Sequence, residues 1–320
     1  MYTSEKMSIQ ERDMDIPKSD DNHYGNKNPF LLLDCYSSHP YEFNNPVYHY
    51  TSIDAFTKII EQRKIWMTDF SGSNDLVENR VIYYLLDRIC ANLKAKSIPD
   101  EDIYLFYKNC KIQIEHTPLF ISCFSKQKDL LSQWRGYAND GKGVAIGFKF
   151  KPQRFSELYP GIYAGKKHHY YAYELLYVGE PPDYDFSLPA AQITESILKY
   201  FKDLKNENLL WFSSFFSRLN AKVKHGGFKE EDEVRIATCP IVVSPPDANG
   251  KSSFVYSGMM KYIPCENSIK PIIEFPFETE EIVEVVIGPK NQTSKEILKA
   301  YLKLKGLEHV KVSQSMTTYR

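Results

Sequence analysis

Residues 46–68 read PVYHYTSIDAFTKIIEQRKIWMT, and this stretch decides the fold class. Its opening run, Val47–Tyr50, is aromatic and follows a proline, as is typical of a short strand. Thr51 or Ser52 can cap a helix, because the apolar residues behind them recur at helical spacing. Lys64–Thr68 (KIWMT) resembles a second strand. The stretch therefore predicts a strand, a helix and a strand.

Strands and helices continue outward from this unit. We expect helices over about 75–93, 100–115, 129–138, 187–203, 206–223 and 294–305, and strands over about 119–124, 143–150, 170–178, 233–241, 253–256, 269–275, 282–288 and 309–313. The strands cluster towards both ends of the chain, with a helical insert between them. This order predicts an α+β fold with a mixed, mostly antiparallel sheet, because a doubly wound fold would alternate strand and helix throughout.

The polar residues 1–28 are rich in Asp, Lys and Asn, and we expect a flexible tail there. Residues 29–320 are long enough for one α+β domain, with the helical insert at about 180–225. The N-terminal residues contain no apolar signal core, and no stretch approaches the roughly 20 apolar residues that cross a bilayer. We therefore expect a cytoplasmic protein with no membrane partner.

Composition limits the kinds of site that the chain can hold. Its 40 basic and 41 acidic residues give a net charge of -1, which argues against a protein that coats DNA but allows a local basic patch. The six cysteines are scattered without zinc-ligand spacing, so we expect neither a disulfide framework nor a structural zinc site. His168-His169 could ligate a metal, but the run Lys166–His169 is more often a solvated loop. Phosphate-binding loops and nucleophile elbows are absent from the sequence.

His49 and Thr51 form the first candidate site. They are two residues apart in an extended segment, so both side chains point to one face. An imidazole and a hydroxyl there can bind ribose hydroxyls or a carboxamide. The alternative is a buried histidine beside a helix cap, and the spacing by itself favours that alternative.

Glu231, Glu233 and Arg235 form the second candidate site, on one face of a predicted strand. Charged side chains are costly to bury unless they are paired, so this pattern indicates a site. A glutamate can accept a hydrogen bond from a ribose hydroxyl and stabilise an oxocarbenium ion during N-glycosidic cleavage. A solvated edge strand, or an Arg235 bridge that closes the sheet, explains the pattern equally well.

The third candidate group surrounds the predicted strand 119–124. Ser122 and Ser125 lie at its end, and Trp134, Arg135 and Tyr137 follow on the next helix. An aromatic ring at this position can stack on a nicotinamide or a base. A tryptophan with a tyrosine three residues later is more often core packing.

Several segments, taken in order, resemble an uncharacterised bacterial family, domain-of-unknown-function family 2971. They are Tyr48–Ser52, Ile65–Met67, Asn74-Asp75 with Glu78, Ile121–Ser125, Trp134 with Tyr137-Ala138, Lys142–Phe148, Glu233–Arg235, Ile287–Pro289, and Ser315 to Tyr319-Arg320. The resemblance spans roughly 46–320. The opening segment also looks like the first motif of ADP-ribosyltransferases, although this chain has no clean Ser-Thr-Ser motif in the middle.

The resemblance to ADP-ribosyltransferases implies an ADP-ribosyltransferase-like architecture with NAD as its substrate and no metal. The catalytic glutamate is then Glu233, with Glu231 as its rival and His49 assisting. The cofactor-binding residues that it implies are His49, Thr51, Ser122, Ser125, Tyr137 and Arg235. Arg135 is the alternative to Arg235 as the phosphate ligand. In this arrangement, His49 and Glu233 face one cleft within about a nucleotide's length.

The function implied is transfer of ADP-ribose from NAD to a macromolecule, either nucleic acid or protein. The setting would be a bacterial toxin or phage defence, and an antitoxin or defence partner fits that setting. The alternative is a non-catalytic module of the same fold that binds a nucleotide or a protein. A third class is a nuclease in which Glu231, Asp232 and a histidine hold a divalent ion. These remain expectations of the sequence.

Overall fold

A computed structural model describes residues 41–70, 78–116, 118–155, 170–178, 187–201, 216, 219–238, 241–243, 254–256, 260–265 and 267–319. The predicted tail 1–28, Asn74-Asp75, His168-His169 and most of the predicted helix 206–223 lie outside these residues. The longer helices are α1 (Ile53–Gln62), α2 (Glu78–Ala95), α3 (Asp100–His116), α4 (Leu131–Tyr137), α5 (Ser187–Phe201) and α7 (Lys295–Leu304). Three short 3-10 helices are η3 (Pro152–Arg154), η4 (Gly226–Glu231) and η5 (Thr279–Glu281).

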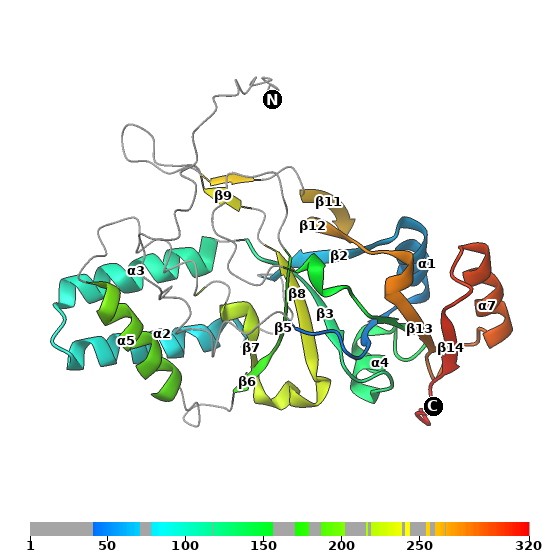
Figure 1. Ribbon diagram of the computed structural model, residues 1–320, viewed down its shortest axis with the longest axis horizontal. Helices are drawn as coiled ribbons and strands as arrows, with labels where there is room; N and C mark the ends of the chain where they lie inside the picture. The colour runs from blue at the N-terminus through cyan, green and yellow to red at the C-terminus, as the bar shows by residue number, and fades with distance from the viewer. Residues whose placement is uncertain are drawn as a thin grey trace, which may run out of the picture.

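One large sheet forms the centre of the molecule (Figure 1). Its strands are β1 (Val47–Thr51), β2 (Lys64–Asp69), β3 (Phe120–Ser125), β4 (Val144–Phe148), β5 (Tyr171–Glu174), β8 (Glu233–Thr238), β11 (Met260–Cys265), β12 (Ser268–Pro276), β13 (Ile282–Ile287) and β14 (Lys311–Gln314). The main order is β11-β12-β2-β3-β1-β4-β13-β14, and β8 with β5 continues from β3. Its neighbours pair antiparallel apart from β13 and β14. The predicted α+β fold with a mostly antiparallel sheet is confirmed.

Strand β3 is the branch point of the sheet. One side of β3 pairs along its whole length with β8. The other side is shared, because Ile121 pairs with Thr68 of β2 while Ser125 pairs with Tyr48 of β1. Strands β1 and β2 therefore separate from each other along β3, and α1 connects them.

The unit formed by β1, α1 and β2 matches its sequence prediction. The Ser52 hydroxyl accepts a hydrogen bond from the Ala55 amide at 3.2 Å, so Ser52 caps α1. The helix ends at Arg63 in a left-handed conformation with φ 55°. Its buried residues Phe56 and Ile60 then pack against the sheet.

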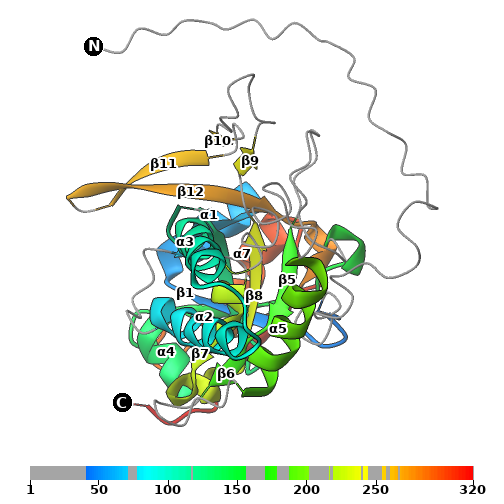
Figure 2. The same cartoon turned by 90° about the vertical axis from the view of Figure 1, so that its left-hand side faces the viewer.

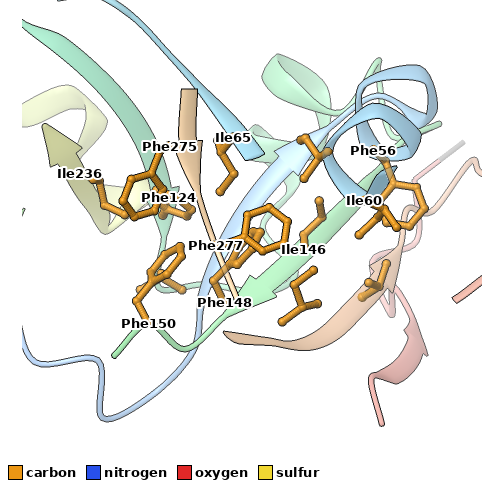
Figure 3. Packing of buried hydrophobic residues seen from close by; sticks show 14 of the residues in the cluster. Phe56, Ile60, Ile65, Phe124, Ile146, Phe148, Phe150, Ile236, Phe275 and Phe277 are labelled. Carbon is orange, nitrogen blue, oxygen red and sulfur yellow. The ribbon is translucent and has the colours of Figure 1, made fainter. Parts of the chain in front are cut away.

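The two faces of the sheet differ in what covers them. Aromatic and aliphatic side chains such as Phe124 and Phe148 fill one face, here called the phenylalanine face (Figure 3). Helices α1 and α7 contribute to that core. Tyr48, Tyr50 and Trp134 pack together on the other face, here called the α4 face because α4 supplies Trp134. Burying both faces fixes the register of the central strands, because a slip of one residue would turn each side chain over.

A helical lobe adjoins the sheet. Helix α5 lies within the predicted insert and packs with α2 and α3, which come from earlier in the chain (Figure 1). Residues predicted as one strand over 170–178 form β5 and β6 (Leu176–Val178), and β6 pairs with β7 (Val223–His225). Strands β9 (Ile241–Val243) and β10 (Phe254–Tyr256) form a separate pair. Figure 2 shows the β11–β12 hairpin reaching out past the helices.

Within the described part of the chain, no helix combines the length and apolar character that crossing a membrane requires.

Candidate functional site

Four buried charged side chains meet where β7, η4 and β8 join. The Glu233 carboxylate accepts hydrogen bonds from Arg235 Nε at 2.6 Å and from Lys224 Nζ at 2.7 Å. Lys224 Nζ also donates to a carboxylate oxygen of Glu231 at 2.6 Å. Each of the four side chains is at most 9% exposed. We call Lys224, Glu231, Glu233 and Arg235 the ion cluster.

The backbone at Asp232 brings the two glutamates to the same lysine. Asp232 adopts a left-handed conformation, with φ 45° and ψ 55°, which Asp tolerates better than most residues. Its carbonyl accepts a hydrogen bond from the Lys126 amide at 3.0 Å. Glu231 therefore ends η4 and does not belong to β8. The prediction that Glu231 and Glu233 alternate along one strand is wrong, because the chain turns between them.

The charges of the ion cluster stabilise one another. Burial raises the pKa of Glu233, but the nearby charges of Arg235 and Lys224 outweigh it and bring the pKa to about 2. Burial lowers the pKa of Lys224, yet Glu233 and Glu231 hold it above its ordinary value. Both groups are therefore ionised at neutral pH. Replacing such a cluster by apolar residues of similar volume is often neutral or stabilising, so stability alone does not require these charges.

Two side chains connect the ion cluster with the surface. Cys123 of β3 is exposed and pairs with Arg235, and its thiol hydrogen-bonds to Glu233. Tyr137 of α4 is 52% exposed, and its pKa is raised to about 12 by burial and then by the charge of Glu231. The charge of Glu231 thus acts on the phenol of Tyr137, at the end of the helix that covers the sheet face to which Glu233 points.

His49 lies on the phenylalanine face of the sheet. It pairs with Ile146, and its ring lies 5.5 Å from that of Phe124, both residues of that core. Its Nδ1 is 3.0 Å from the Cys123 carbonyl oxygen. Since a carbonyl only accepts, Nδ1 carries the proton in this bond. Burial lowers the pKa of His49, which favours the neutral ring.

The strand register separates His49 from Glu233. Tyr48 pairs with Ser125, and Ser125 pairs with Glu233, so these three side chains point to the α4 face. His49 follows Tyr48 and points to the other face, as does Thr51. The expectation that His49 and Glu233 face one cleft is wrong. The prediction that His49 and Thr51 share a face agrees with the structure.

The two serines of β3 also lie on different faces. Ser125 is buried on the α4 face, where its hydroxyl donates to the Glu231 carbonyl oxygen at 2.7 Å and accepts from the Gln127 amide at 3.0 Å. Ser122 pairs with Ile236 and is buried in the phenylalanine face. Its hydroxyl has no hydrogen-bond partner among the described residues. Ser125 thus fastens η4 to β3, while Ser122 lies away from the ion cluster.

The three predicted residues of α4 also lie in different surroundings. Trp134 is fully buried and packs edge-on against Tyr50, with 4.7 Å between ring centroids, so it is core packing. Arg135 lies 5.9 Å from the centroid of the Tyr319 ring, outside the ion cluster. Tyr137, of the three, is the residue whose pKa the charge of Glu231 helps to raise.

Lys224 and Cys123 are site residues that the sequence predictions missed. Lys224 lies just beyond residues predicted as the end of a helix. The alternation of apolar and lysine residues in Ala221–Lys224 is a strand pattern that could have indicated β7. Cys123 was considered only as one of six scattered cysteines. It is two residues before Ser125 in the predicted strand, so strand alternation could have placed both side chains on the same face.

Among the described residues, no three His, Cys, Asp or Glu side chains gather in a way that could hold a metal ion. The nuclease expectation, with Glu231 and Asp232 on a divalent ion, therefore gains no support. Asp232 instead pairs with Lys126 at 3.1 Å.

Comparison with known proteins gives one partial match. A family model described as a protein of unknown function (DUF2971) matches residues 133–236, about a third of the chain. The matched stretch runs from α4 into β8 and includes Tyr137 and the whole ion cluster. No curated protein matches the chain, and no solved structure does. The chain is thus similar to this family over the part that builds the candidate site.

Proposed function

We propose that this protein binds a nucleotide, in the first place NAD, where Tyr137 lies beside the ion cluster. The observation that supports the proposal is a pair of buried glutamates that share Lys224, of which Glu233 is ionised, on the sheet face covered by the helix that carries the exposed ring of Tyr137. An exposed tyrosine can stack on a base or a nicotinamide. Carboxylates accept hydrogen bonds from ribose hydroxyls. The proposal leaves His49, Thr51 and Ser122 out of this site, because they point to the phenylalanine face.

Transfer of ADP-ribose is the second candidate function, and the ionised state of Glu233 favours it. With a pKa of about 2, Glu233 is negative at neutral pH and can stabilise an oxocarbenium ion. Arg235 and Lys224 occupy both of its oxygens in the observed arrangement. One of these cations must therefore move before Glu233 can face the anomeric carbon of a ribose, whereas a hydrogen bond from a ribose hydroxyl needs only a further lone pair on a carboxylate oxygen. Binding without turnover needs no such step, which is why binding is the first proposal.

If transfer takes place, the acceptor is a macromolecule, either nucleic acid or protein. A toxin or phage-defence setting is what the ADP-ribosyltransferase resemblance of the opening segment implies, although His49 and Thr51 of that segment point away from the proposed site. That resemblance rests on the order of motifs in the sequence. Labelled NAD incubated with protein and cell lysate would identify both the reaction and the acceptor.

Binding can be tested by calorimetric titration of NAD into the purified chain. Tyr137→Ala should weaken binding by roughly 1–3 kcal/mol, the usual contribution of one stacked base. Glu233→Gln should also weaken it, because it removes the charge from the ribose-binding oxygens. Equal affinity in both variants and the wild type would contradict the proposed site, and no binding by the wild type would contradict the proposal itself.

Glu281→Gln provides the matched control. Glu281 is also a buried, ion-paired glutamate, 1% exposed, but it pairs with Arg154 and caps η5. Its loss should lower stability and leave the affinity for NAD unchanged. In the lysate assay, label transfer that Glu233→Gln abolishes and Glu281→Gln retains would support ADP-ribose transfer. Binding of NAD without any NAD consumption would instead support the non-catalytic nucleotide-binding module.

A further inference from the structure

Asp129 connects α4 with a segment far along the chain. One of its carboxylate oxygens accepts hydrogen bonds from Trp134 Nε1 at 2.7 Å, from the Ser315 hydroxyl at 2.5 Å and from the Thr317 hydroxyl at 3.0 Å. The other accepts from the Met316 amide at 2.7 Å. The carboxylate therefore joins the indole of α4 to the backbone and side chains of Ser315–Tyr319, here called the strap.

The far end of the strap is also fastened beside α4. The Tyr319 hydroxyl donates to Asp140 at 2.7 Å, just beyond the helix. Lys290 pairs with the same carboxylate at 2.9 Å and lies 3.8 Å from the centroid of the Tyr319 ring. Arg135 of α4 is on the same ring. The strap therefore holds α4 at both of its ends.

The inner side of α4 is held by β1. The Tyr50 hydroxyl donates to the Gln127 carbonyl at 2.7 Å and accepts from the Leu130 amide at 3.0 Å. Trp134 packs on the Tyr50 ring. These contacts lie at the start and middle of the helix. Tyr137 is the last residue of this helix, which covers the sheet face to which Glu233 points, so its position depends on how firmly the whole helix is held.

We propose that Asp129 is a positioning residue, and that it and the strap hold α4 so that Tyr137 stays against the ion cluster. This inference rests on the proposed nucleotide site, which it deepens by adding a control on one of its walls. Asp129 itself touches neither the cluster nor Tyr137 in any described contact. Burial opposes ionisation of Asp129, but the bonds from Ser315, Trp134 and Met316 hold its pKa below the ordinary value, so the anchor is charged at neutral pH.

The variants should weaken the contacts between the strap and α4 while leaving the sequence of α4 unchanged. Ser315→Ala with Thr317→Val removes two of the donors to Asp129, and Asp129→Asn weakens the whole anchor. Met316→Ala is the matched control, because its side chain is 89% exposed while its amide is kept. We expect the first two variants to speed amide hydrogen exchange over residues 131–138, with no change over α1, and the control to exchange like the wild type.

Ionisation of Tyr137 reports its position without any nucleotide. NMR of tyrosine labelled with carbon-13 at the ring ζ carbon, assigned with Tyr137→Phe, should show the pKa of about 12 falling towards the ordinary value in the strap variants. Affinity for NAD should fall roughly three- to thirtyfold, as for residues that act through a neighbour. The control should change neither quantity.

The outcomes separate the two proposals. Unchanged exchange over α4, or faster exchange with an unchanged Tyr137 titration, would overturn the positioning role. A wild-type chain that fails to bind NAD would overturn the proposed function, while the Tyr137 titration would still decide the role of the strap. Faster exchange and a lower tyrosine pKa with unchanged affinity would also overturn the inference, because the helix would then not govern the site.

Discussion

Single residues near α4 differ sharply in how much change they can accept. A Cβ built on Gly143 would lie 2.0 Å from the Thr51 carbonyl oxygen, where two backbone segments cross. The Gly143 amide also bonds to the Ala138 carbonyl at 2.8 Å. Gly136, inside α4, has nothing within 4 Å of the same position. The first glycine is required by close approach of the backbone, and the second is not.

The two glycines make a matched pair of variants. Gly143→Ala should destabilise the protein by roughly 1–3 kcal/mol or more, because the backbone of Thr51 would have to shift. Gly136→Ala should stabilise it by about 0.5–1 kcal/mol, since alanine favours the helix. Thermal unfolding of both variants measures the difference. A Gly143→Ala variant that melts at the same temperature as the wild type would contradict the close approach of Gly143 to the Thr51 backbone.

Residue-level prediction succeeded where the signal was local. Ser52 was one of two predicted caps, and the shared face of His49 and Thr51 followed from strand alternation. Local rules did not predict the turn at Asp232. The left-handed backbone of this aspartate ends η4 before β8 begins, whereas the sequence pattern indicated one strand with alternating charges. They also could not relate the face of His49 to that of Glu233. That relation depends on pairings between β1, β3 and β8, which come from distant parts of the sequence.

At the level of elements, the ion cluster fastens β7 and η4 onto β8. Lys224 Nζ holds two carboxylates at once, from the end of η4 and the start of β8. Removing one partner of a buried ion network leaves its opposite charge unpaired and costs about 3–5 kcal/mol. Lys261 provides the contrast, because its pair with Glu274 is 2.8 Å long but its side chain is 58% exposed.

Replacing each lysine by methionine tests this difference. Lys224→Met should lower the free energy of unfolding by about 3–5 kcal/mol, because Glu231 and Glu233 would share one site without their cation. Lys261→Met should change it by about 0–1 kcal/mol, as is usual for exposed pairs. Urea denaturation gives both values. Similar losses in the two variants would show that burial of the cluster has no special energetic weight.

At the level of the whole molecule, buried carboxylates make stability depend on pH. The pKa of Glu233 is about 2 in the folded protein, below its ordinary value of 4.5, because Arg235 and Lys224 overcome burial. The contribution of Glu233 to the free energy of unfolding is therefore fully present above its ordinary pKa and is lost as the pH falls towards 2. Hydrogen bonds from Ser313 and Tyr48 likewise overcome burial and lower the pKa of Glu284.

The acid limb of the stability curve should therefore depend on Glu233. Between pH 4.5 and 2 the wild type should lose roughly 3 kcal/mol through this residue. Glu233→Gln should be less stable at pH 7 but show a shallower decline below pH 4.5, since the titrating group is gone. Urea midpoints at pH 7, 5 and 3 test this, and parallel curves for the two proteins would contradict it.

The sheet order has a consequence for how the protein is made. Strand β8, the partner of β3, is translated much later than β3. The strap beyond β14, which contacts α4, is translated later still. A nascent chain on the ribosome therefore contains Tyr137 and both glutamates before the strap has been synthesised. The hydrogen bonds between the strap and Asp129 and Asp140 can therefore form only after residue 319 has been synthesised.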